Sequence, residues 1–281
     1  MRTLKKIRGL CELISGGGPE CHVSPKWLLQ TSSRIESRFL ASTPIERRED
    51  EEFQYFKVRG REFVWPLAAS PAKLFFLLSE LLEEEHPHHY QWGKTRIRPG
   101  DHVLDIGCCE GGFAAEVVSA GGNVTAIEPS RANTRLIERL FLLRNLPPPR
   151  IINCLLGSEL GELHFEDDPS NPGGSSVRPG PSPGTYPVPM MTLDSMMDHG
   201  LLDRIDFIKC DAEGNDPAIL KGGERFLLRH QPKIAVTTYH RQEDFREIHD
   251  FLLGLGYSVQ GKGFLFSGDK LRVLMLHAWR E

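Results

Sequence analysis

Five short runs rich in β-forming residues follow Arg98, and their spacing constrains the fold of this chain more than any other feature. The runs are HVLDIG, NVTAIEP, RIINCLLG, IDFIKCD and KIAVTTYH. Segments with helical character, GGFAAEVVSAG and SRANTRLIERLFLLRN, separate the first three runs. Alternating strands and helices form right-handed βαβ units, so we expect an α/β fold with a mostly parallel sheet covered on both faces. The last segment, YSVQGKGFLF-SGDK-LRVLMLHAW, predicts a C-terminal antiparallel hairpin.

The first third of the chain has a different character. Residues 1 to about 50 are polar and mixed in charge, which predicts a loose leader or a helical extension. Residues 53–65 alternate around Gly60 and predict a short hairpin. A helix is expected next, with Ser70 as its N-cap and Pro71 in its first turn. We therefore divide the chain into an N-terminal extension or helical cap, residues 1–95, and a second domain, residues 96–281.

Composition narrows the class of partner. The chain has 281 residues, 40% of them hydrophobic, which is enough to bury a large core. Its net charge of −4, with acids and bases interspersed, provides no basic field for nucleic acid. Six cysteines without CxxC spacing indicate reduced thiols, and the richest apolar run, LAASPAKLFFLL, is too short to span a bilayer. We expect a soluble, cytoplasmic protein whose partner is a small molecule rather than nucleic acid or a membrane.

A glycine-containing turn follows the first strand of the second domain. Asp105 lies near the strand end, and Gly107 and Gly111 lie where the chain turns into a helix, at the sheet edge where α/β proteins bind ligands. Glu128 ends the next strand, where a carboxylate can accept hydrogen bonds from ribose hydroxyls. Cys109 stands where a dinucleotide fingerprint needs glycine, which disfavours NAD and favours S-adenosylmethionine. The alternative is a plain structural turn with a solvated Glu128. The candidate cofactor-binding residues are Asp105, Gly107, Cys109, Glu110, Gly111, Phe113, Glu128 and Pro129.

Charged residues cluster at the end of the fourth run, IDFIKCDAEGND. Odd positions of a strand share one face, so Ile205 and Phe207 are expected in the core. Lys209, Asp211 and Glu213 follow on the same face, at the sheet edge where a crevice opens. Two close carboxylates raise one another's pKa, which makes Asp211 and Glu213 candidate bases.

Three neighbouring residues have both structural and functional interpretations. Lys209 is either an ion-pair partner for an acid or a group that holds the substrate. Asp216 precedes Pro217 and is expected to cap a helix. His240 ends the run KIAVTTYH, next to the Asp211 strand, and is a candidate catalytic or substrate-binding group, although a lone histidine is more often structural.

A metal site is the alternative use of these carboxylates, because paired acids suit Mg²⁺ or Ca²⁺. Without further clear ligands we expect no metal. The cluster HPHH, residues 86–89, is expected to be a polar helix end rather than a zinc site. The proline- and glycine-rich residues 167–189 are expected to form a long loop.

Together these motifs resemble the FkbM-type methyltransferases, an S-adenosylmethionine-dependent family with a Rossmann-like class I sheet. The resemblance extends from about Tyr90 to Trp279, and RPGDHVLDIGCCEGGF and VTAIEP are similar to the family's cofactor segments. Its more specific part is a Thr-Leu-Asp segment followed by Lys-x-Asp-x-Glu-Gly, which matches TLD and KCDAEG here. Asp216 stands where glutamate is usual in the family. The resemblance implies O-methylation of a hydroxyl on a sugar or secondary metabolite.

We therefore expect one in-line transfer of a methyl group to a hydroxyl of a small molecule. Asp211, Glu213 or His240 is the expected base, and Lys209 is expected to hold an acid or the substrate. Residues 167–189 and those before Arg98 are expected to cover the acceptor. The alternatives are a nicotinamide-dependent oxidoreductase and a non-catalytic binding protein that keeps the fold. A nucleic-acid base methylase is less favoured, because no Asn/Asp-Pro-Pro-aromatic signature follows the fourth strand.

Overall fold

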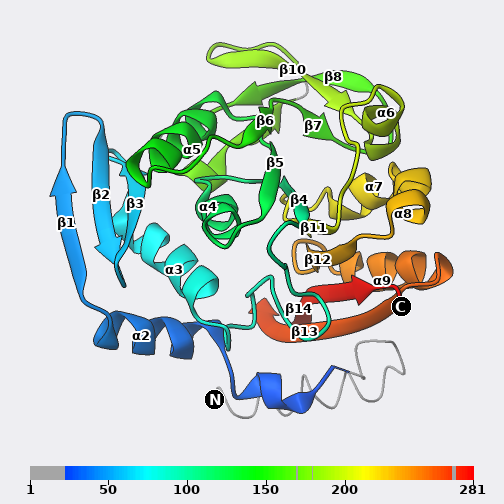
Figure 1. Cartoon of the computed structure of the whole chain (residues 1–281), viewed down its shortest axis with the longest axis horizontal. Helices are drawn as coiled ribbons and strands as arrows, with labels where there is room; N and C mark the ends of the chain where they lie inside the picture. Colours follow the sequence, from blue (N-terminus) through cyan, green and yellow to red (C-terminus); the bar gives the residue numbers. More distant parts are fainter. Residues whose placement is uncertain (1–22, 169, 179, 268–269) are drawn as a thin grey trace.

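A central sheet of seven strands organises the protein (Figure 1). The computed structural model describes residues 23–281 except 169, 179 and 268–269. The strand order is β13-β14-β12-β11-β4-β5-β6; the five strands from β12 to β6 are parallel, and β13 and β14 are antiparallel. The bounds are β4 His102–Ile106, β5 Asn123–Ile127, β6 Arg150–Ile152, β11 Phe207–Cys210, β12 Lys233–Thr237, β13 Ser258–Ser267 and β14 Lys270–Trp279. The predicted Rossmann-like sheet with a C-terminal hairpin is confirmed.

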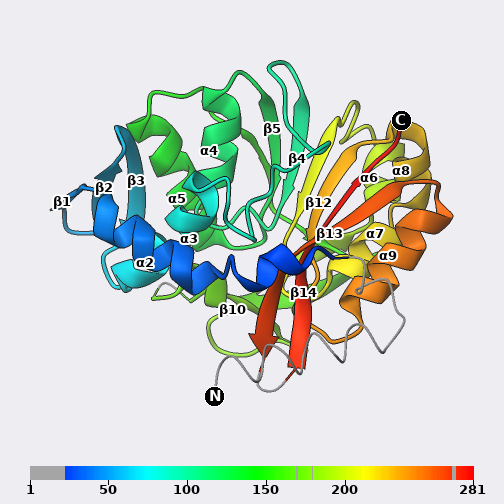
Figure 2. The same cartoon turned by 90° about the horizontal axis from the view of Figure 1, so that it is seen from below.

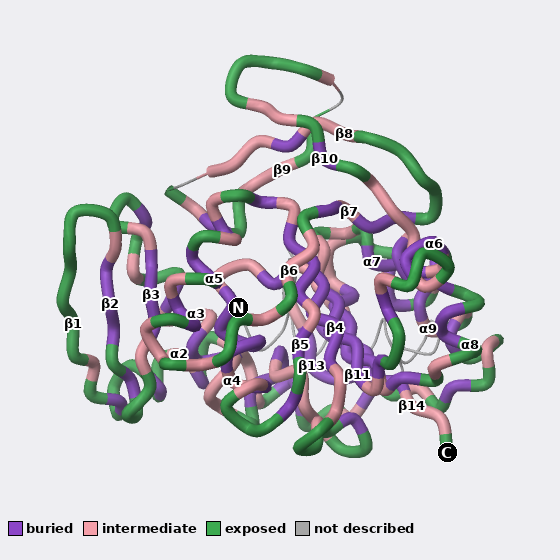
Figure 3. Tube along the Cα trace, turned by 45° about the horizontal axis from the view of Figure 1, so that its top comes forward, coloured by how far each residue is buried: buried purple, intermediate pink, exposed green. Residues whose placement is uncertain are grey.

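Helices cover both faces of this sheet, because its central strands are buried on both sides. Helices α4 and α5 lie on one face and α7, α8 and α9 on the other (Figure 1). The bounds are α4 Gly112–Ser119, α5 Arg131–Leu143, α6 Leu193–Asp198, α7 Asp216–Lys221, α8 Glu224–His230 and α9 Asp244–Gly254. The burial-coloured tube shows the central strands as mostly buried chain inside a more exposed periphery (Figure 3).

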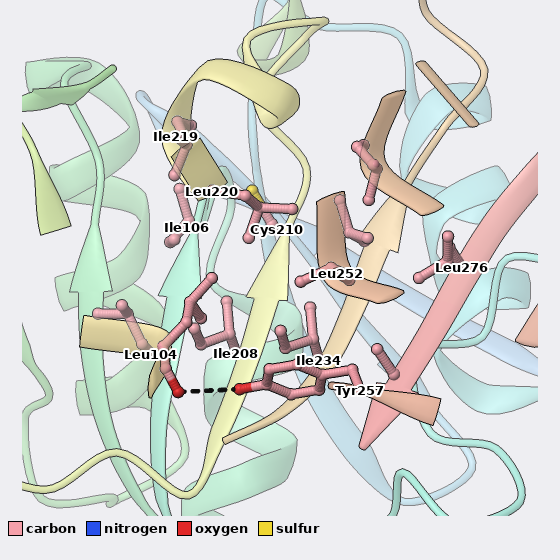
Figure 4. Packing of buried hydrophobic residues seen from close by; sticks show 14 of the residues in the cluster. Leu104, Ile106, Ile208, Cys210, Ile219, Leu220, Ile234, Leu252, Tyr257 and Leu276 are labelled. Atoms are coloured by element: carbon pink, nitrogen blue, oxygen red, sulfur yellow. Dashed lines mark hydrogen bonds between the residues drawn. The ribbon is translucent and has the colours of Figure 1, made fainter. Parts of the chain in front are cut away.

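Successive residues of each strand serve opposite faces of the sheet. Leu104 and Ile208 pack with residues of α7 and α9 (Figure 4), whereas Phe207 packs on the α4 side. Ile205, expected on the same face as Phe207, lies in the opposite cluster. The reason is that β11 begins at Phe207, so Ile205 precedes the regular alternation.

The elements of the N-terminal part are η2 Pro25–Leu28, α2 Ser32–Ser42, β1 Ile45–Glu49, β2 Phe53–Val58, β3 Arg61–Pro66 and α3 Pro71–Leu82. They form a layer whose β3 and α3 pack against α5 and α4, while its first described element, η2, packs against β13 (Figures 1 and 2). The predicted hairpin is confirmed: β2 and β3 pair across a turn at Arg59 and Gly60, both with positive φ. Ser70 is the N-cap residue of α3, although its side chain makes no cap hydrogen bond.

Strand β1 corrects the expectation of a loose or helical segment up to residue 50. The backbone of β1 pairs with β2, while all but one of its side chains are exposed. A strand whose side chains are charged and exposed shows no apolar alternation, so its sequence gave no signal. The expectation for residues 1–22 lies outside the described residues.

A four-stranded sheet includes part of the long loop expected at residues 167–189, namely residues 176–178 and 185–189. Its order is β7-β10-β8-β9. The bounds are β7 Leu155–Leu156, β8 Gly161–Glu166, β9 Ser176–Arg178 and β10 Thr185–Met191, with a short η3 at Pro172–Gly174. Strand β10 contains Pro187 and Pro189, which lack an N–H donor. At both prolines β10 pairs with β8 on one edge only, because β7 pairs with β10 later, at Met190 and Met191. The prolines therefore lie where one edge of β10 has no neighbouring strand and no N–H donor is needed.

The cysteines Cys108, Cys109, Cys154 and Cys210 are free thiols, as expected, and Cys11 and Cys21 lie outside the described residues. Among the helices of the described chain, none has both the length and the apolar character required to cross a bilayer.

Candidate active site

One large cavity lies at the carboxyl ends of β4, β5 and β11. Its volume is about 1300 Å³, which exceeds the range of roughly 300–1,000 Å³ usual for one small ligand. Residues of the central sheet line one side of it. Residues of α2, α3, the four-stranded sheet with η3, and the C-terminal hairpin line most of the rest. The cavity therefore lies between the parallel sheet and the N-terminal layer, with space for a cofactor and a second molecule.

A buried ion pair joins the first and fourth strands beside this cavity. Strand pairing places Lys209 of β11 directly opposite Asp105 of β4, and Nζ lies 3.1 Å from Oδ1. The same ammonium donates to the backbone oxygens of Ile106, at 3.2 Å, and Gly107. Burial lowers the pKa of Lys209, but Asp105 and Asp211 outweigh that effect and raise it above its ordinary value. Lys209 therefore remains charged and ties the glycine turn to β11.

The turn from Gly107 to Gly111 needs its glycines for two close approaches. Gly107 has φ +72°, and a Cβ there would overlap the backbone oxygen of Asp211. Gly111 has φ +82°, and a Cβ there would lie 3.0 Å from Ile137. Cys109, which replaces a glycine of the dinucleotide fingerprint, also has positive φ, at +53°. The turn is thus pressed against the end of β11 on one side and α5 on the other.

Glu128 at the end of β5 is buried, with 4% of its surface exposed, which contradicts a solvated residue. Its Oε2 accepts from the N–H of Cys109 at 2.8 Å, and its Oε1 accepts from the N–H of Ser130 at 2.9 Å and from Asn133 Nδ2 at 3.3 Å. Burial raises the pKa of Glu128 to about 7 despite these donors. A carboxylate has about four lone-pair sites, so three are used and one, on Oε2, has no partner among the described residues.

The remaining candidate cofactor residues divide into two groups. Cys109, Glu110, Phe113 and Pro129 line the cavity together with Gly107 and Glu128. Asp105 and Gly111 are not among the described residues that line it. They act on its shape, Asp105 through Lys209 and Gly111 through its contact with α5.

Asp211 lies on the cavity surface immediately after β11. Its Oδ2 accepts from the hydroxyl of Tyr90 at 2.8 Å, and its Oδ1 accepts from Thr237 Oγ1 at 3.2 Å. Burial alone raises the pKa of Asp211, but the positive charges of His88, Lys209 and other neighbours outweigh it, so this pKa is lowered. The carboxylate is therefore ionised and oriented at neutral pH.

The other expected bases lie around Asp211 in different surroundings. His240 Nε2 is 3.7 Å from Asp211 Oδ1 and 3.5 Å from Glu213 Oε2. Glu213 lines the cavity, but its side chain is 71% exposed; partial desolvation and Asp211 raise its pKa. Burial lowers the pKa of His240, but the nearby carboxylates, Asp216 first, raise it overall. The structure thus brings the predicted catalytic residues together. Among the three candidate bases, Asp211 is the one that both lines the cavity and is largely enclosed.

Asp216 has a role other than the expected helix cap. The N-cap residue of α7 is Asn215, and Asp216 is the first helical residue. Its fully buried carboxylate accepts from the N–H groups of Ala212 at 3.0 Å and Gly214 at 3.2 Å. Asp216 therefore stabilises the turn that carries Asp211 and Glu213, because its oxygens point back along the chain.

Sequence reasoning missed four side chains that line the cavity near Asp211: Glu80, His88, Tyr90 and Tyr239. The expectation of a polar helix end at residues 86–89 is wrong, since His86 and His88 are 0% and 3% exposed. The segment HPHHY, residues 86–90, contains these side chains, but no feature of the neighbouring sequence indicates that it contacts the end of β11, more than a hundred residues later. Within the described residues, no group of three or more histidines, cysteines or acids is arranged to hold a metal ion.

Comparison with known protein families identifies a match for more than half of the chain. The family model described as the methyltransferase FkbM domain matches residues 105–259, just over half of the chain. No curated protein matches the chain.

Solved structures with a similar arrangement include a methyltransferase FkbM from Methylobacillus flagellatus KT, at 19% identity and a TM-score of 0.48. That match covers 75% of this chain and 56% of the other, so this chain spans little more than half of that protein. The precorrin-6y C5,15-methyltransferase of Geobacter metallireducens GS-15 matches at 12% identity and a TM-score of 0.41, covering 66% of this chain and 84% of the other. The magnesium protoporphyrin IX methyltransferase of Synechocystis PCC 6803 with bound SAM matches at 15% identity and a TM-score of 0.39, covering 65% and 71%.

Proposed function

This chain belongs to the FkbM methyltransferase family, and on that premise we propose that it transfers a methyl group from S-adenosylmethionine to a hydroxyl of a small molecule, a sugar or a secondary metabolite. The observation that carries the proposal is that Glu128 and Asp211 line one cavity, on either side of the Gly107 turn. The Glu128 carboxylate is suited to accept a hydrogen bond from a ribose hydroxyl, and the Asp211 carboxylate is suited to accept a proton.

The donor half of the site fits the cofactor. The turn from Gly107 to Gly111, the open lone pair of Glu128, and the side chains of Phe113 and Pro129 surround the space at the ends of β4 and β5. These residues would hold the nucleoside and amino-acid ends. The cofactor supplies an electrophilic methyl carbon, so the protein mainly aligns two reactants, an effect worth up to about 7 to 11 kcal/mol.

Asp211 is the base that the geometry favours. His240 is not among the described residues that line the cavity, and Glu213 is largely exposed to water. The acceptor oxygen bonds to the methyl carbon as the carbon–sulfur bond breaks, and the O–H proton passes to Asp211. A hydroxyl becomes a strong acid as its oxygen is alkylated, so an ionised carboxylate of low pKa is basic enough.

The charge of the cavity favours a neutral or cationic acceptor. Its lining acids are Glu36, Glu80, Glu110, Glu128, Asp211 and Glu213, and its lining bases are Lys73, Lys209 and His88. His88 lies between two of these acids, Glu80 and Asp211. Lys209 is already paired with Asp105. The remaining surface is largely apolar, from side chains such as Phe76, Leu77 and Phe264. Phosphorylated acceptors and nucleic acid would meet repulsion here.

The test has two stages. A thermal-shift comparison of S-adenosylhomocysteine with NAD separates a methyltransferase from an oxidoreductase, because a ligand at 100 times its Kd stabilises by about 2.7 kcal/mol. Radiolabelled methyl transfer is then measured on simple sugars, catechols and aliphatic alcohols, each beside its phosphate ester or carboxylate. We expect stabilisation by S-adenosylhomocysteine and labelling of neutral hydroxyl compounds. Binding without labelling of any compound would support the non-catalytic alternative.

A further inference from the structure

Three titratable side chains form a buried row from α3 to the end of β11. His88 Nδ1 lies 3.2 Å from Glu80 Oε2, and His88 Nε2 lies 3.8 Å from Asp211 Oδ2. The side chains of Glu80, His88 and Asp211 are 9%, 4% and 19% exposed. Asp211 belongs to the sheet domain matched by the family model, while Glu80 and His88 precede residue 105. The row therefore connects the N-terminal layer to the proposed base.

Aromatic rings enclose the imidazole of His88. The ring of Tyr90 lies 5.2 Å from it and the ring of Tyr239 5.7 Å, both in edge-to-face arrangements. Tyr90 also donates its hydroxyl to the same Asp211 oxygen that faces His88. Neither ring nitrogen of His88 has a hydrogen-bond partner within the described chain, so the two carboxylates are its polar neighbours at ion-pair distance.

Charge is distributed unevenly along the row. Burial raises the pKa of Glu80, and the opposing charge of His88 only reduces the rise. Burial lowers the pKa of His88, but Glu80 and Asp211 outweigh it and raise this pKa above the ordinary value. The His88 imidazolium lies between two acids, Glu80 and Asp211. Of the two, Asp211 also has Lys209 nearby, and its pKa is the one that is lowered. The charged and titratable groups that surround His88 are Glu80 on α3, His86 and Tyr90 on the following connection, Lys209 and Asp211 at the end of β11, and Tyr239 and His240 after β12.

We propose that Glu80 and His88 are positioning residues that keep the Asp211 carboxylate charged and turned into the cavity. The proposal rests on the proposed methyl transfer, in which Asp211 takes the hydroxyl proton. It assigns the N-terminal layer a part in the chemistry as well as in covering the acceptor. An imidazolium about 4 Å from a carboxylate lowers the pKa of that carboxylate by about 1 to 3 units. Removal of the imidazolium should therefore raise the titration midpoint of Asp211 by a measurable amount.

The experiment measures that titration directly and needs no acceptor. The full chain is labelled with carboxyl-¹³C aspartate, and the Asp211 signal is assigned from the Asp211→Asn variant. In the unsubstituted protein we expect a midpoint below the ordinary value of about 3.9. In His88→Gln we expect the midpoint to rise by about one pH unit or more. Glu80→Gln should move this midpoint little, because the raised pKa of Glu80 leaves its carboxyl neutral where Asp211 titrates. It should instead lower the midpoint of His88, which loses the carboxylate that favours its protonation.

His86→Gln is the matched control. His86 is also fully buried, two residues away, but burial lowers its pKa to about 2, so it carries no positive charge for Asp211. We expect its substitution to change thermal stability and to leave the Asp211 midpoint unchanged. If His88→Gln does not fold, Glu80→Gln with ¹³C-labelled histidine supplies the second measurement, a fall in the His88 midpoint.

An Asp211 midpoint that is the same in the unsubstituted protein and in His88→Gln would overturn the proposal, as would an equal rise in His86→Gln or a His88 midpoint that Glu80→Gln leaves unchanged. S-adenosylhomocysteine binding is measured on the same samples. If the unsubstituted protein does not bind S-adenosylhomocysteine, the proposed function is rejected, but the carboxylate titrations can still be interpreted. The two failures are thus distinguishable.

Discussion

At the scale of single residues, Asp211 and Glu213 form a natural pair for comparison, because they are close in sequence and differ in environment. Asp211 is enclosed by Tyr90, Thr237 and His88, whereas Glu213 is 71% exposed. Loss of a general base usually costs on the order of 10² to 10⁴ in rate. We expect Asp211→Asn to lower kcat by that factor and Glu213→Gln by less than about tenfold, as measured by steady-state kinetics on any labelled acceptor. Equal losses in both variants would contradict the assignment of Asp211.

Glu128 predicts a pH dependence of cofactor affinity. Its pKa of about 7 lies above the ordinary value, so the carboxyl becomes protonated as pH falls through 7. The neutral form has a weaker acceptor for a ribose hydroxyl and for the Cys109 N–H, so binding should weaken on the acid side and be strongest above pH 7. Calorimetry between pH 5.5 and 8.5 should show S-adenosylhomocysteine affinity falling about tenfold per unit below the midpoint.

Glu128→Gln provides the control for this dependence. It cannot titrate, so its affinity should be weaker by about ten- to a hundredfold, consistent with roughly 1.5–3 kcal/mol for a hydrogen bond to a charged group, and flat over the same range. A slope in the variant that equals the slope in the unsubstituted protein would assign the pH dependence to another group.

Local signals were sufficient to select several of the candidate site residues. Gly107, Gly111 and Glu128 follow strand ends, and strand ends can be read from short apolar runs. Asp216 was misinterpreted because an acid before Pro217 is also the pattern of a helix cap, and only the backbone geometry shows which N–H groups its oxygens reach. His88 was missed because its partners come from α3 and β11, which the sequence does not bring together.

At the scale of elements, the Asp105–Lys209 pair joins β4 and β11 in the centre of the sheet. Removing one partner of a buried pair leaves an uncompensated charge, which usually costs about 3–5 kcal/mol. We expect Asp105→Asn and Lys209→Met each to lower the free energy of unfolding by that amount, and the double variant to lose less than the sum. Urea denaturation in a double-mutant cycle measures the coupling.

An exposed pair serves as the matched control for that cycle. Arg225 and Asp198 form an ion pair at 2.6 Å with side chains 60% and 49% exposed. Arg225→Met and Asp198→Asn should each cost less than about 1 kcal/mol. If Asp105→Asn and Lys209→Met each lower the free energy of unfolding by as little as these exposed variants do, Lys209 does not hold the two strands together.

Elements with apolar alternation or periodicity were predicted, and those without it were not. Strands β4, β5, β11 and β12 and helices α3 to α5 carry such patterns. Strand β1 has charged, exposed side chains, and β10 has two prolines on a one-sided stretch, so neither resembles a buried strand in sequence. Their pairing partners, rather than their own composition, determine that they are strands.

At the scale of the whole molecule, the N-terminal layer and the parallel sheet share a core. Tyr55 of β2 is 1% exposed and belongs to the cluster that contains Phe113 and Leu140. Its hydroxyl donates to Asp50 at 2.5 Å and accepts from Arg139 of α5 at 2.6 Å. We therefore propose that residues 23–95 and the sheet domain unfold together, although the sequence divides them.

Tyr55→Ala tests this joint unfolding. Truncation of a large buried aromatic side chain costs about 3–5 kcal/mol, and the loss should move far-ultraviolet circular dichroism and tryptophan fluorescence to the same lower urea midpoint. Both measurements use a variant that keeps Trp65 of β3, fully buried in the N-terminal layer, and has Trp27, Trp92 and Trp279 replaced by phenylalanine, so that its fluorescence reports that layer. An earlier fluorescence transition with an unchanged circular-dichroism midpoint would mean that the two parts fold independently.

The division of the cavity between two segments has an evolutionary consequence. The residues that we propose to bind the donor lie in the stretch matched by the family model, whereas α2 and α3 contribute much of the surface opposite. Exchange of the N-terminal segment among relatives would alter which compounds are modified without disturbing how the donor is handled. Under the role proposed for Glu80 and His88, which lie on that same segment, such a recombinant would need an equivalent acid–imidazole couple along with its new specificity.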